Sequence, residues 1–172
     1  LEFRRVLFRS AGVYPANQYT CRGVSYWQDR TVSEPALCSS RIIFGTLDSR
    51  LIALDARTGQ KCSAFGESGE LTIEPSISLR WPGEFQITSA PAIVGDVVVT
   101  GTAIGDNLRT KAPRGTVHAF DIRTGEEKWV FNPLQAMPDA DVGHANVWST
   151  IAADEDRGLV FLPTSSASPD YY

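Results

Sequence analysis

The sequence predicts an all-β fold in which a unit of short antiparallel strands is repeated. Runs of alternating apolar and polar residues recur along the chain, and turns rich in Gly, Asp and Pro separate them. The phrase Leu54-Asp-Ala-Arg-Thr-Gly59 returns as Phe120-Asp-Ile-Arg-Thr-Gly125. No segment sustains the periodicity of an amphipathic helix. The chain is therefore expected to consist of strands and hairpins.

Each predicted strand is a short run that ends at turn-forming residues. Leu47-Asp48-Ser49 is predicted to join two strands as a tight hairpin, and Gly95-Asp96 to join two others. The polar segments 28–40 and 66–86 are predicted to be loops. In order, the predicted strands cover residues 21–27, 41–46, 50–55, 61–65, 88–94, 97–102, 115–122, 127–131, 147–153 and 159–162.

Repeated hairpins that carry a fixed motif favour a β-propeller. Such a repeat cannot bury its apolar face alone, and radial packing of four-stranded blades also protects the strand edges. The last strand of one repeat carries an aromatic residue, Trp129. A β-sandwich would not explain why the Asp-x-x-Thr-Gly phrase returns at the same place in the unit. Residues 11–172 are therefore expected to form about two to three antiparallel blades of a larger propeller.

Residues 1–10 are expected not to belong to the native protein. Leu1-Glu-Phe-Arg-Arg-Val-Leu-Phe-Arg-Ser10 resembles the translation of a sequencing-adapter oligonucleotide, and its mixture of arginine and bulky apolar residues differs from the rest of the chain. It lacks the continuous apolar region and the small-residue cleavage site of a signal peptide. The chain is accordingly expected to be a fragment of a longer protein.

The composition argues against two classes of partner. A net charge of -4 and an isoelectric point near 5.2, with charges scattered along the chain, disfavour nucleic acid. No apolar run approaches the roughly 18 residues of a membrane span, so a membrane is expected to be reached only through a segment not present here. Cys21, Cys38 and Cys62 form no C-x-x-C metal motif, and their odd number leaves at least one without a partner in this chain.

The segment 100–109 is the first candidate for a binding site. It follows the apolar run Val97-Val98-Val99, and its glycines place Asp106 and Asn107 in a loop at the exit of a strand. Carboxylate and amide oxygens in this position suit a hard cation or the polar edge of a cofactor. An ordinary Asp/Asn turn is the alternative interpretation.

Several longer motifs resemble a known family. They are Cys21-Arg-Gly-Val-Ser-Tyr26, Arg50-Leu-Ile-Ala-Leu-Asp-Ala56, Thr88-Ser-Ala-Pro-Ala-Ile93, Gly105-Asp-Asn107, Gly158-Leu-Val-Phe-Leu-Pro163 and Ser168-Pro-Asp170. Together with the blade phrase they resemble the pyrroloquinoline quinone (PQQ)-dependent dehydrogenases, in particular the glucose/quinate/shikimate dehydrogenase-like branch, from about Cys21 to Tyr172. The resemblance implies an eight-bladed propeller with PQQ on its axis beside a Ca²⁺ or Mg²⁺ ion.

The resemblance implies five residues that bind the organic cofactor: Arg22, Thr88, Asn107, Trp148 and Ser168. Arg22 resembles the arginine that pairs with a PQQ carboxylate, a task that suits the planar guanidinium fork. Thr88 resembles the threonine that hydrogen-bonds the quinone, and Trp148 the tryptophan that stacks under it. The structural alternatives are a surface charge, a threonine at the start of a strand and an aromatic residue of the propeller core.

The resemblance also implies a set of oxygen ligands near the metal ion. Asp106 corresponds to an acidic metal ligand, and Asn107 beside it, typical of this branch, to a cofactor-binding residue. Ser166 and Ser168 lie where the family offers a further oxygen, Ser166 toward the metal and Ser168 toward the cofactor. The turn that carries these serines, 164–169, lacks the glycine that the family pattern has there.

Other positions depart from the family or are interpreted as structural. Glucose-oxidising members usually have a histidine where this chain has Trp27, and a vicinal disulfide of the alcohol-oxidising branch is absent because only Cys21 occurs there. The family's catalytic aspartate and lysine correspond to positions beyond Tyr172, so no catalytic residue is expected in this chain. His118 is predicted to be a structural or solvent-facing strand residue; His144, in a loop near Trp148, is left unassigned.

The function implied by the resemblance is that of a periplasmic quinoprotein dehydrogenase. It would oxidise a sugar, polyol or cyclic hydroxy acid with PQQ and pass the electrons to a quinone or cytochrome acceptor. The other class considered is a non-catalytic propeller that acts as an assembly scaffold or sensor domain. A scaffold has no reason to place Arg22, Asp106 and Trp148 on one axis. Residues 11–172 alone are expected to be inactive, because an axial site collects groups from several blades.

A disulfide between Cys38 and Cys62 is predicted from the hairpin between them together with this periplasmic context. Cys38 precedes and Cys62 follows residues 41–55, whose hairpin brings the two flanks toward each other. An oxidising compartment would allow the bridge to form. Cys21 is then expected to remain unpaired.

Overall fold

A computed structural model describes residues 12–33, 36–137 and 143–170. The segment 1–10, predicted to be non-native, lies outside these ranges. The described residues form β-strands and no helix, which confirms the predicted all-β class. In particular, this part of the chain contains no helix long and apolar enough to cross a membrane.

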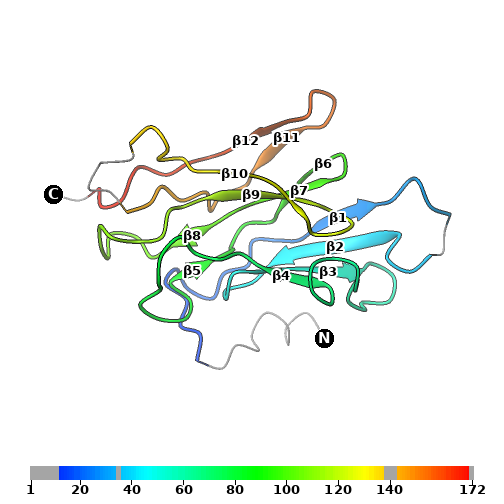
Figure 1. The fold of residues 1–172 in the computed structure, drawn as a ribbon, viewed down its shortest axis with the longest axis horizontal. Coiled ribbons are helices and arrows are strands. Elements are labelled where there is room, and N and C mark those ends of the chain that lie inside the picture. The colour runs from blue at the N-terminus through cyan, green and yellow to red at the C-terminus, as the bar shows by residue number, and fades with distance from the viewer. Residues whose placement is uncertain (1–11, 34–35, 138–142, 171–172) are drawn as a thin grey trace.

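Two four-stranded antiparallel sheets and the hairpin of a third account for most of the fold (Figure 1). The first sheet has the order β1-β2-β3-β4 and the second the order β6-β7-β9-β10. A small two-stranded sheet pairs β5 with β8. The strand bounds are β1 Ser25–Gln28, β2 Ser40–Gly45, β3 Arg50–Asp55, β4 Glu70–Thr72, β5 Phe85–Gln86, β6 Ala92–Val94, β7 Val97–Gly101, β8 Ala103–Ile104, β9 Val117–Asp121, β10 Glu127–Phe131, β11 Ala152–Asp154 and β12 Leu159–Phe161.

The sheets are arranged as successive blades. The first strand of the second sheet, β6, contacts β1 of the first sheet on one side and the β11–β12 hairpin on the other. In Figure 1 the three sheets follow one another from the lower to the upper part of the view. Equivalent first strands therefore lie side by side, as the predicted propeller requires.

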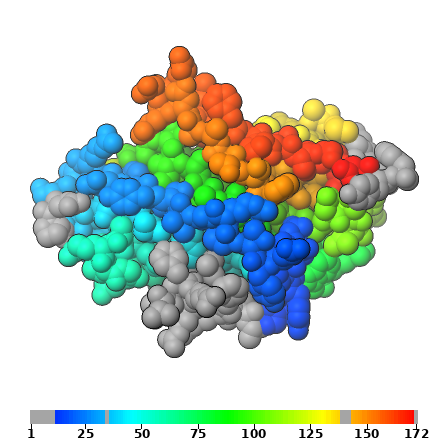
Figure 2. Space-filling model, turned by 180° about the vertical axis from the view of Figure 1, so that it is seen from behind, coloured from blue at the N-terminus to red at the C-terminus, as the bar shows by residue number. Residues whose placement is uncertain are grey.

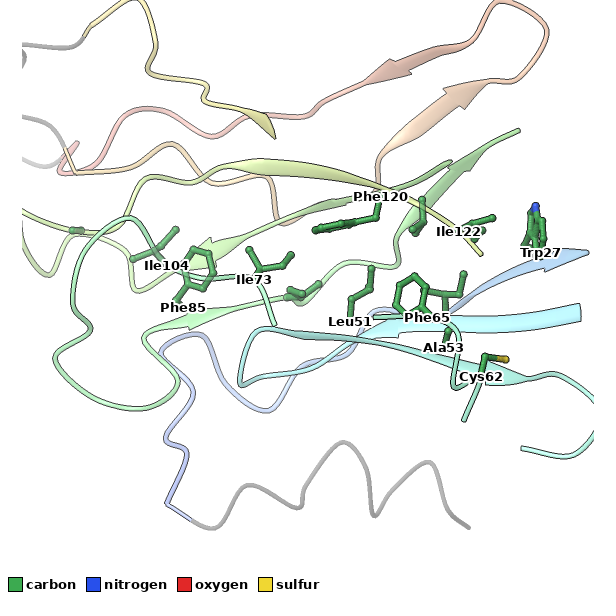
Figure 3. Packing of buried hydrophobic residues seen from close by; sticks show 14 residues of the cluster. Trp27, Leu51, Ala53, Cys62, Phe65, Ile73, Phe85, Ile104, Phe120 and Ile122 are labelled. Carbon is green, nitrogen blue, oxygen red and sulfur yellow. The ribbon is translucent and has the colours of Figure 1, made fainter. Parts of the chain in front are cut away.

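The apolar core fills the space between neighbouring sheets. Figure 3 shows Leu51, Phe65, Phe85, Phe120 and Ile122 of one cluster between the first two sheets, and all five are buried. A second cluster joins the second sheet to the start of the third and contains Ala92, Val99, Val117, Ala119, Val147 and Ile151. A third, smaller cluster, Phe44, Ile52 and Leu54, lies within the first sheet. Much of the apolar surface of each blade is thus buried against the next blade, as expected for a repeat architecture.

The repeated Asp-x-x-Thr-Gly phrase closes the same turn in both complete sheets. The Asp55 carboxylate accepts hydrogen bonds from the backbone N–H and the hydroxyl of Thr58 at 2.7 and 2.9 Å, and Asp121 makes the equivalent bonds to Thr124 at 3.0 and 3.2 Å. The final glycines, Gly59 and Gly125, have φ values of 73° and 76°, a left-handed conformation that glycine adopts without strain. The sequence repeat is therefore a repeat of hydrogen bonds.

The strand predictions are wrong where the backbone hydrogen bonds go to segments other than the predicted neighbouring strand. Residues 61–65 were predicted as a strand but make only one isolated bridge, Leu54 to Lys61. The fourth strand, β4, instead lies inside the predicted loop 66–86, as does β5. The third repeat begins late, at Ala152, because Val147 donates its N–H to the Thr102 carbonyl outside any sheet ladder.

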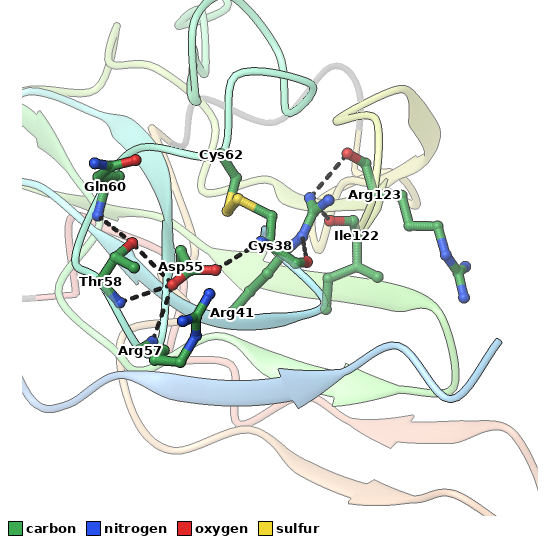
Figure 4. The surroundings of a disulfide bond; sticks show 9 residues. All are labelled: Cys38, Arg41, Asp55, Arg57, Thr58, Gln60, Cys62, Ile122 and Arg123. Atoms are coloured by element: carbon green, nitrogen blue, oxygen red, sulfur yellow. Dashed lines mark hydrogen bonds between the residues drawn. A yellow bond between two sulfur atoms is a disulfide. The ribbon is translucent and has the colours of Figure 1, made fainter. Parts of the chain in front are cut away.

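The predicted disulfide between Cys38 and Cys62 is confirmed, with a Cα–Cα distance of 5.7 Å (Figure 4). It ties the segment before β2 to the segment after β3. The Asp55 carboxylate, which closes the adjacent turn, also accepts the Cys38 N–H at 2.6 Å. Cys21 is exposed and not in a disulfide.

An arginine-rich joint holds the first two sheets together. The Arg123 guanidinium lies 4.8 Å from the centre of a Trp27 ring and pairs with Asp29 at 2.6 Å. The Arg41 guanidinium lies 5.6 Å from the Trp27 ring and donates to the carbonyls of Ile122 and Arg123, both at 2.8 Å. Trp27 and Asp29 belong to the first sheet and Arg123 to the second, so these contacts fix the two blades relative to each other.

Replacing both bridged cysteines, Cys38 and Cys62, by serine is expected to lower the free energy of unfolding by about 3 kcal/mol, because the bridge closes a loop of 24 residues. Denaturant unfolding of the complete protein measures this change. Cys21→Ser is the control and should leave stability unchanged. Alkylation of the native protein at both Cys38 and Cys62 would contradict the bridge.

Asp29→Asn is expected to cost about 2 kcal/mol of stability at neutral pH, since it removes a buried, charge-assisted partner of Arg123. The Arg123 hydrogen bond holds the pKa of Asp29 below its usual 3.8, so its contribution is complete above pH 3.8 and is lost as the pH falls toward the folded-state value. The difference from wild type should therefore shrink below about pH 4 in unfolding curves.

The exposed pair of Asp154 with Arg157 offers a matched comparison for Asp29. Asp154→Asn should cost about 1 kcal/mol or less, because solvent screens an exposed pair. An Asp29→Asn penalty that is no larger than this, or that is independent of pH, would contradict the assigned strength of the joint.

Candidate functional site

Four of the predicted site residues line a single pocket of about 220 Å³: Arg22, Thr88, Asp106 and Trp148. They come from segments that precede β1, β6 and β11 and that follow β8. Figure 2 shows the blue N-terminal segment beside the orange segment that precedes β11 on the face opposite that of Figure 1. The other lining residues are Asn17, Ala103 and Asn146.

Arg22 and Trp148 form one wall of this pocket. The Arg22 guanidinium lies 4.8 Å from the centre of the Trp148 ring, and Trp148 is 44% exposed. The Arg22 N–H donates to the Thr88 carbonyl at 2.9 Å, which places the arginine beside the start of the neighbouring blade. The wall therefore presents a fixed positive charge next to an accessible aromatic surface.

Thr88 contributes a hydroxyl that lacks a partner within the described part of the chain. Its side chain lines the pocket although the residue is only 2% exposed. A buried hydroxyl without a hydrogen bond is costly, so this group, in a residue that lines the pocket, is suited to a polar ligand atom or a water molecule. This orphaned hydroxyl is independent support for a binding function.

Asp106 is exposed to the pocket from a sharply turned loop. The next residue, Asn107, has a φ of 53°, in the left-handed region. The Asn107 N–H donates both to Asp106 Oδ1 at 3.1 Å and to Ser168 Oγ at 3.0 Å. Asp106 thus lines the pocket from a loop whose backbone is hydrogen-bonded to Ser168.

Asn107, Ser166 and Ser168 gather beside the pocket and are not among its lining residues. The Asn107 amide exchanges two hydrogen bonds of 2.8 Å with Asp170, through the Asp170 carboxylate and its backbone N–H. The Ser166 hydroxyl donates to the same carboxylate. Hydrogen bonds from Ser166 and Asn107 lower the pKa of the Asp170 carboxyl.

Ser168 is buried, and its backbone fixes a crossing of two chain segments. Its N–H donates to the His144 carbonyl at 2.7 Å, and its carbonyl accepts the Gly143 N–H at 2.7 Å. Its hydroxyl accepts from Asn107. The structure therefore connects three predicted site residues, Asn107, Ser166 and Ser168, in one hydrogen-bond network with Asp170.

Asn146 is a pocket residue that sequence reasoning missed. Its amide makes a double hydrogen bond to the backbone of Ile104, since Nδ2 donates to the carbonyl and Oδ1 accepts the N–H, both at 3.0 Å. Asn17 Nδ2 donates to the same carbonyl at 3.2 Å. Both asparagines recognise the backbone of a residue far away in sequence, so no local motif could have indicated them.

Close backbone approaches allow the segment before Trp148 to reach the pocket. A Cβ atom at Gly101 would collide with the Val147 carbonyl, and one at Gly115 with the Ala145 carbonyl. Only glycine leaves room for the chain to pass at these two places. The path of residues 145–147 therefore depends on two glycines of the second blade.

The histidines and Trp27 lie outside the pocket. His118 is buried in β9 and bonds Thr116 and Glu127, each at 2.8 Å, which confirms its structural role. His144 is fully buried with Nε2 3.2 Å from the Gly105 carbonyl, and burial lowers the pKa of its imidazole. Trp27 lies in the joint between the first two blades, beside Arg41 and Arg123.

The lining groups fit PQQ, which is planar and carries several carboxylates. Arg22 supplies a cationic fork, Trp148 an aromatic face and Thr88 an unpaired hydroxyl. For a metal ion, Asp106 supplies one carboxylate. No three His, Cys, Asp or Glu side chains in residues 12–33, 36–137 and 143–170 come together as a metal site, so an ion at Asp106 would need further oxygens, for which a cofactor carboxylate is suited.

The chain is similar in sequence to several dehydrogenases. The glycerol dehydrogenase large subunit of Gluconobacter thailandicus is 33% identical over 169 residues, which are 92% of this chain and 23% of that protein. Quinoprotein glucose dehydrogenase A of Acinetobacter calcoaceticus is 30% identical over 89% of this chain and 22% of its own length. Quinate/shikimate dehydrogenase (quinone) of Acinetobacter baylyi is 31% identical over 88% of this chain and 22% of its own length. The chain thus spans less than a quarter of these relatives.

Solved structures of related proteins confirm the propeller fold. A quinohemoprotein alcohol dehydrogenase from Pseudomonas putida HK5 superposes with a TM-score of 0.62 at 25% identity, over 87% of this chain and 21% of that one. The enzyme of the same name from Comamonas testosteroni gives a TM-score of 0.62 at 23% identity and supports the fold alone. A family model of PQQ type, described as the glucose/ethanol/alcohol dehydrogenase β-propeller domain, matches residues 9–172, and the chain therefore belongs to this family.

Proposed function

We propose that this chain forms part of the PQQ pocket of a quinoprotein dehydrogenase that oxidises a sugar, polyol or cyclic hydroxy acid. The observation that carries the proposal is the convergence of Arg22, Thr88, Asp106 and Trp148 on one pocket from separate segments. A propeller that served only as a scaffold would need neither an orphaned hydroxyl nor an exposed aromatic face there. The substrate classes follow the names of the relatives, which act on glycerol, glucose and quinate.

Each wall of the pocket has a distinct role in binding. Arg22 pairs with a cofactor carboxylate, and its stacking on Trp148 orients the guanidinium. The exposed Trp148 face supports the planar ring system, while the Thr88 hydroxyl satisfies a polar atom on its edge. These residues orient the cofactor and exclude water from its face, which is the protein's main contribution in cofactor enzymes.

Asp106 is the proposed ligand of a Ca²⁺ or Mg²⁺ ion. A carboxylate is a hard ligand, and its loop is held by Asn107 and the Ser166–Ser168 turn. Direct contacts of Asn107 and Ser168 with the cofactor, and of Ser166 with the ion, stay predictions. When bound, PQQ would supply the two-electron oxidation of the alcohol group, and a divalent ion held by Asp106 would supply Lewis-acid polarisation.

The remaining steps involve groups that this chain is not proposed to supply. The hydroxyl proton is expected to go to the aspartate of the family, which corresponds to no position in this sequence. The electrons are expected to pass to a quinone or a cytochrome. The Cys38–Cys62 disulfide supports an oxidising compartment, and we place the protein in the periplasm.

The test of the proposed function is reconstitution of the complete protein with PQQ and Ca²⁺ or Mg²⁺. Sugar- or polyol-dependent reduction of an artificial dye should appear only when both are present. A panel containing glycerol, glucose and quinate identifies the substrate class. A protein that binds no PQQ under these conditions would show that the proposal is wrong and favour the scaffold function.

Asp106→Asn is expected to reduce metal-dependent dye reduction by at least about 100-fold, because it removes a charged ligand from the ion. Steady-state rates over a range of Ca²⁺ and Mg²⁺ concentrations measure the loss. Asp156→Asn, at an exposed aspartate in the β11–β12 turn, is the matched control and should behave as wild type. Full activity of the Asp106→Asn variant would show that Asp106 is not a metal ligand.

Arg22→Gln is expected to weaken PQQ binding about 10- to 100-fold, since a charge-assisted pair with a carboxylate is lost. Trp148→Leu should weaken it about 5- to 30-fold through the loss of the stacking surface. Titration of the metal-loaded protein with PQQ, followed by fluorescence, gives both values. Arg30→Gln, an exposed arginine outside the pocket, is the control; an equal effect there would indicate nonspecific electrostatics.

A further inference from the structure

A buried ion pair lies behind the pocket and has no role in the proposed chemistry. Glu84 is 1% exposed, and its carboxylate receives both arms of the Arg109 guanidinium, at 2.7 Å to Oε1 and 2.8 Å to Oε2. The Arg80 N–H donates to the same carboxylate at 2.7 Å. A fully buried carboxylate is costly unless it is paired in this manner, and apolar residues of similar volume often stabilise a fold equally well. Stability alone therefore does not explain why an ion pair is present at this position.

Glu84 holds both ends of the loop that carries Asp106. Its backbone carbonyl accepts the Gly105 N–H at 3.2 Å, one residue before Asp106. Its side chain holds Arg109, three residues after Asp106. The neighbouring residue Phe85 pairs with Ile104 in the β5–β8 sheet. One residue thus fixes the entry and the exit of the five-residue segment from Gly105 to Arg109.

The opposite side of the same loop is held by the segment before Trp148. Asn146 grips the Ile104 backbone with two hydrogen bonds, and His144 Nε2 contacts the Gly105 carbonyl. Glu84 acts from the first-to-second blade connection, and Asn146 and His144 act from the connection to the third. Asp106, exposed between these supports, is left free to face the pocket.

We propose that Glu84 is a positioning residue, which sets the place of the Asp106 carboxylate through Gly105 and Arg109. The inference rests on the proposed function, because it assumes that Asp106 binds the divalent ion. Supports behind a metal ligand orient it, and their loss typically lowers metal affinity about 10- to 100-fold. Glu84 itself touches neither cofactor nor ion in this proposal.

The experiment uses the complete protein and follows PQQ binding by fluorescence while Ca²⁺ or Mg²⁺ is titrated. In Glu84→Gln, which keeps the shape but removes the charge, the ion concentration for half-maximal PQQ binding should rise about 10- to 100-fold. Glu70→Gln is the matched control, because Glu70 pairs with Arg50 and Lys61 away from the pocket. It should require the wild-type ion concentration.

Thermal unfolding without ion or PQQ separates positioning from stability. A merely structural role would lower the melting temperature of Glu84→Gln and leave the ion requirement of the folded protein within twofold of wild type, which would overturn the inference. Arg109→Lys, which keeps the charge but offers one donor group in place of the fork, should raise the ion requirement by a smaller factor. Its result decides the question if Glu84→Gln does not fold.

Two further outcomes are decisive. Failure of both variants to fold would make the pair a purely structural one and overturn the positioning role. Absence of ion-dependent PQQ binding in the wild-type protein would overturn the proposed function itself, and that result is distinguishable because it does not depend on any variant.

Discussion

The stacking of Arg123 on Trp27, together with its ion pair to Asp29, fixes the relation between the first two blades, and the pocket depends on that relation. Arg22 precedes the first strand of one blade and Thr88 precedes the first strand of the next. Their backbone hydrogen bond can form only when the two blades keep this spacing. The contact of Trp27 with Arg123 lies at the other end of β1 from Arg22. It thus determines the geometry of the pocket although neither residue lines it.

Within this arrangement of the blades, buried polar side chains stabilise the pocket by forming hydrogen bonds to main-chain atoms. The Asn146 amide bonds the Ile104 backbone, the Glu84 carboxylate accepts the Arg80 N–H, and the Ser168 hydroxyl accepts the Asn107 N–H. These hydrogen bonds restrict the loop backbone to one position, because a hydrogen bond has a preferred direction. Apolar packing alone is non-directional and would allow several positions. The pocket is thereby arranged before any ligand enters it, which limits the conformational entropy lost on binding.

The features that the sequence predicted correctly are those with local causes. The Asp55 and Asp121 turns, the hairpins and the β-propeller repeat follow from short motifs, and the Cys38–Cys62 bridge follows from the hairpin it encloses together with the expected compartment. The missed features depend on distant partners. β4 forms because β3 offers a free edge, and Glu84 and Asn146 acquire roles only through backbone groups 21 to 42 positions away. The resemblance of the motifs to a known family indicated four residues that line the pocket. It could not distinguish residues that line the pocket from residues that only hold the lining segments in place.

Gly101 and Gly115 have a consequence for how such a pocket can diverge during evolution. At both positions a methyl group would strike a backbone carbonyl, which has no alternative rotamer through which to yield. A larger residue at either position would therefore force residues 145–147 to move. Exchanging side chains carried on that path changes the pocket without this backbone cost.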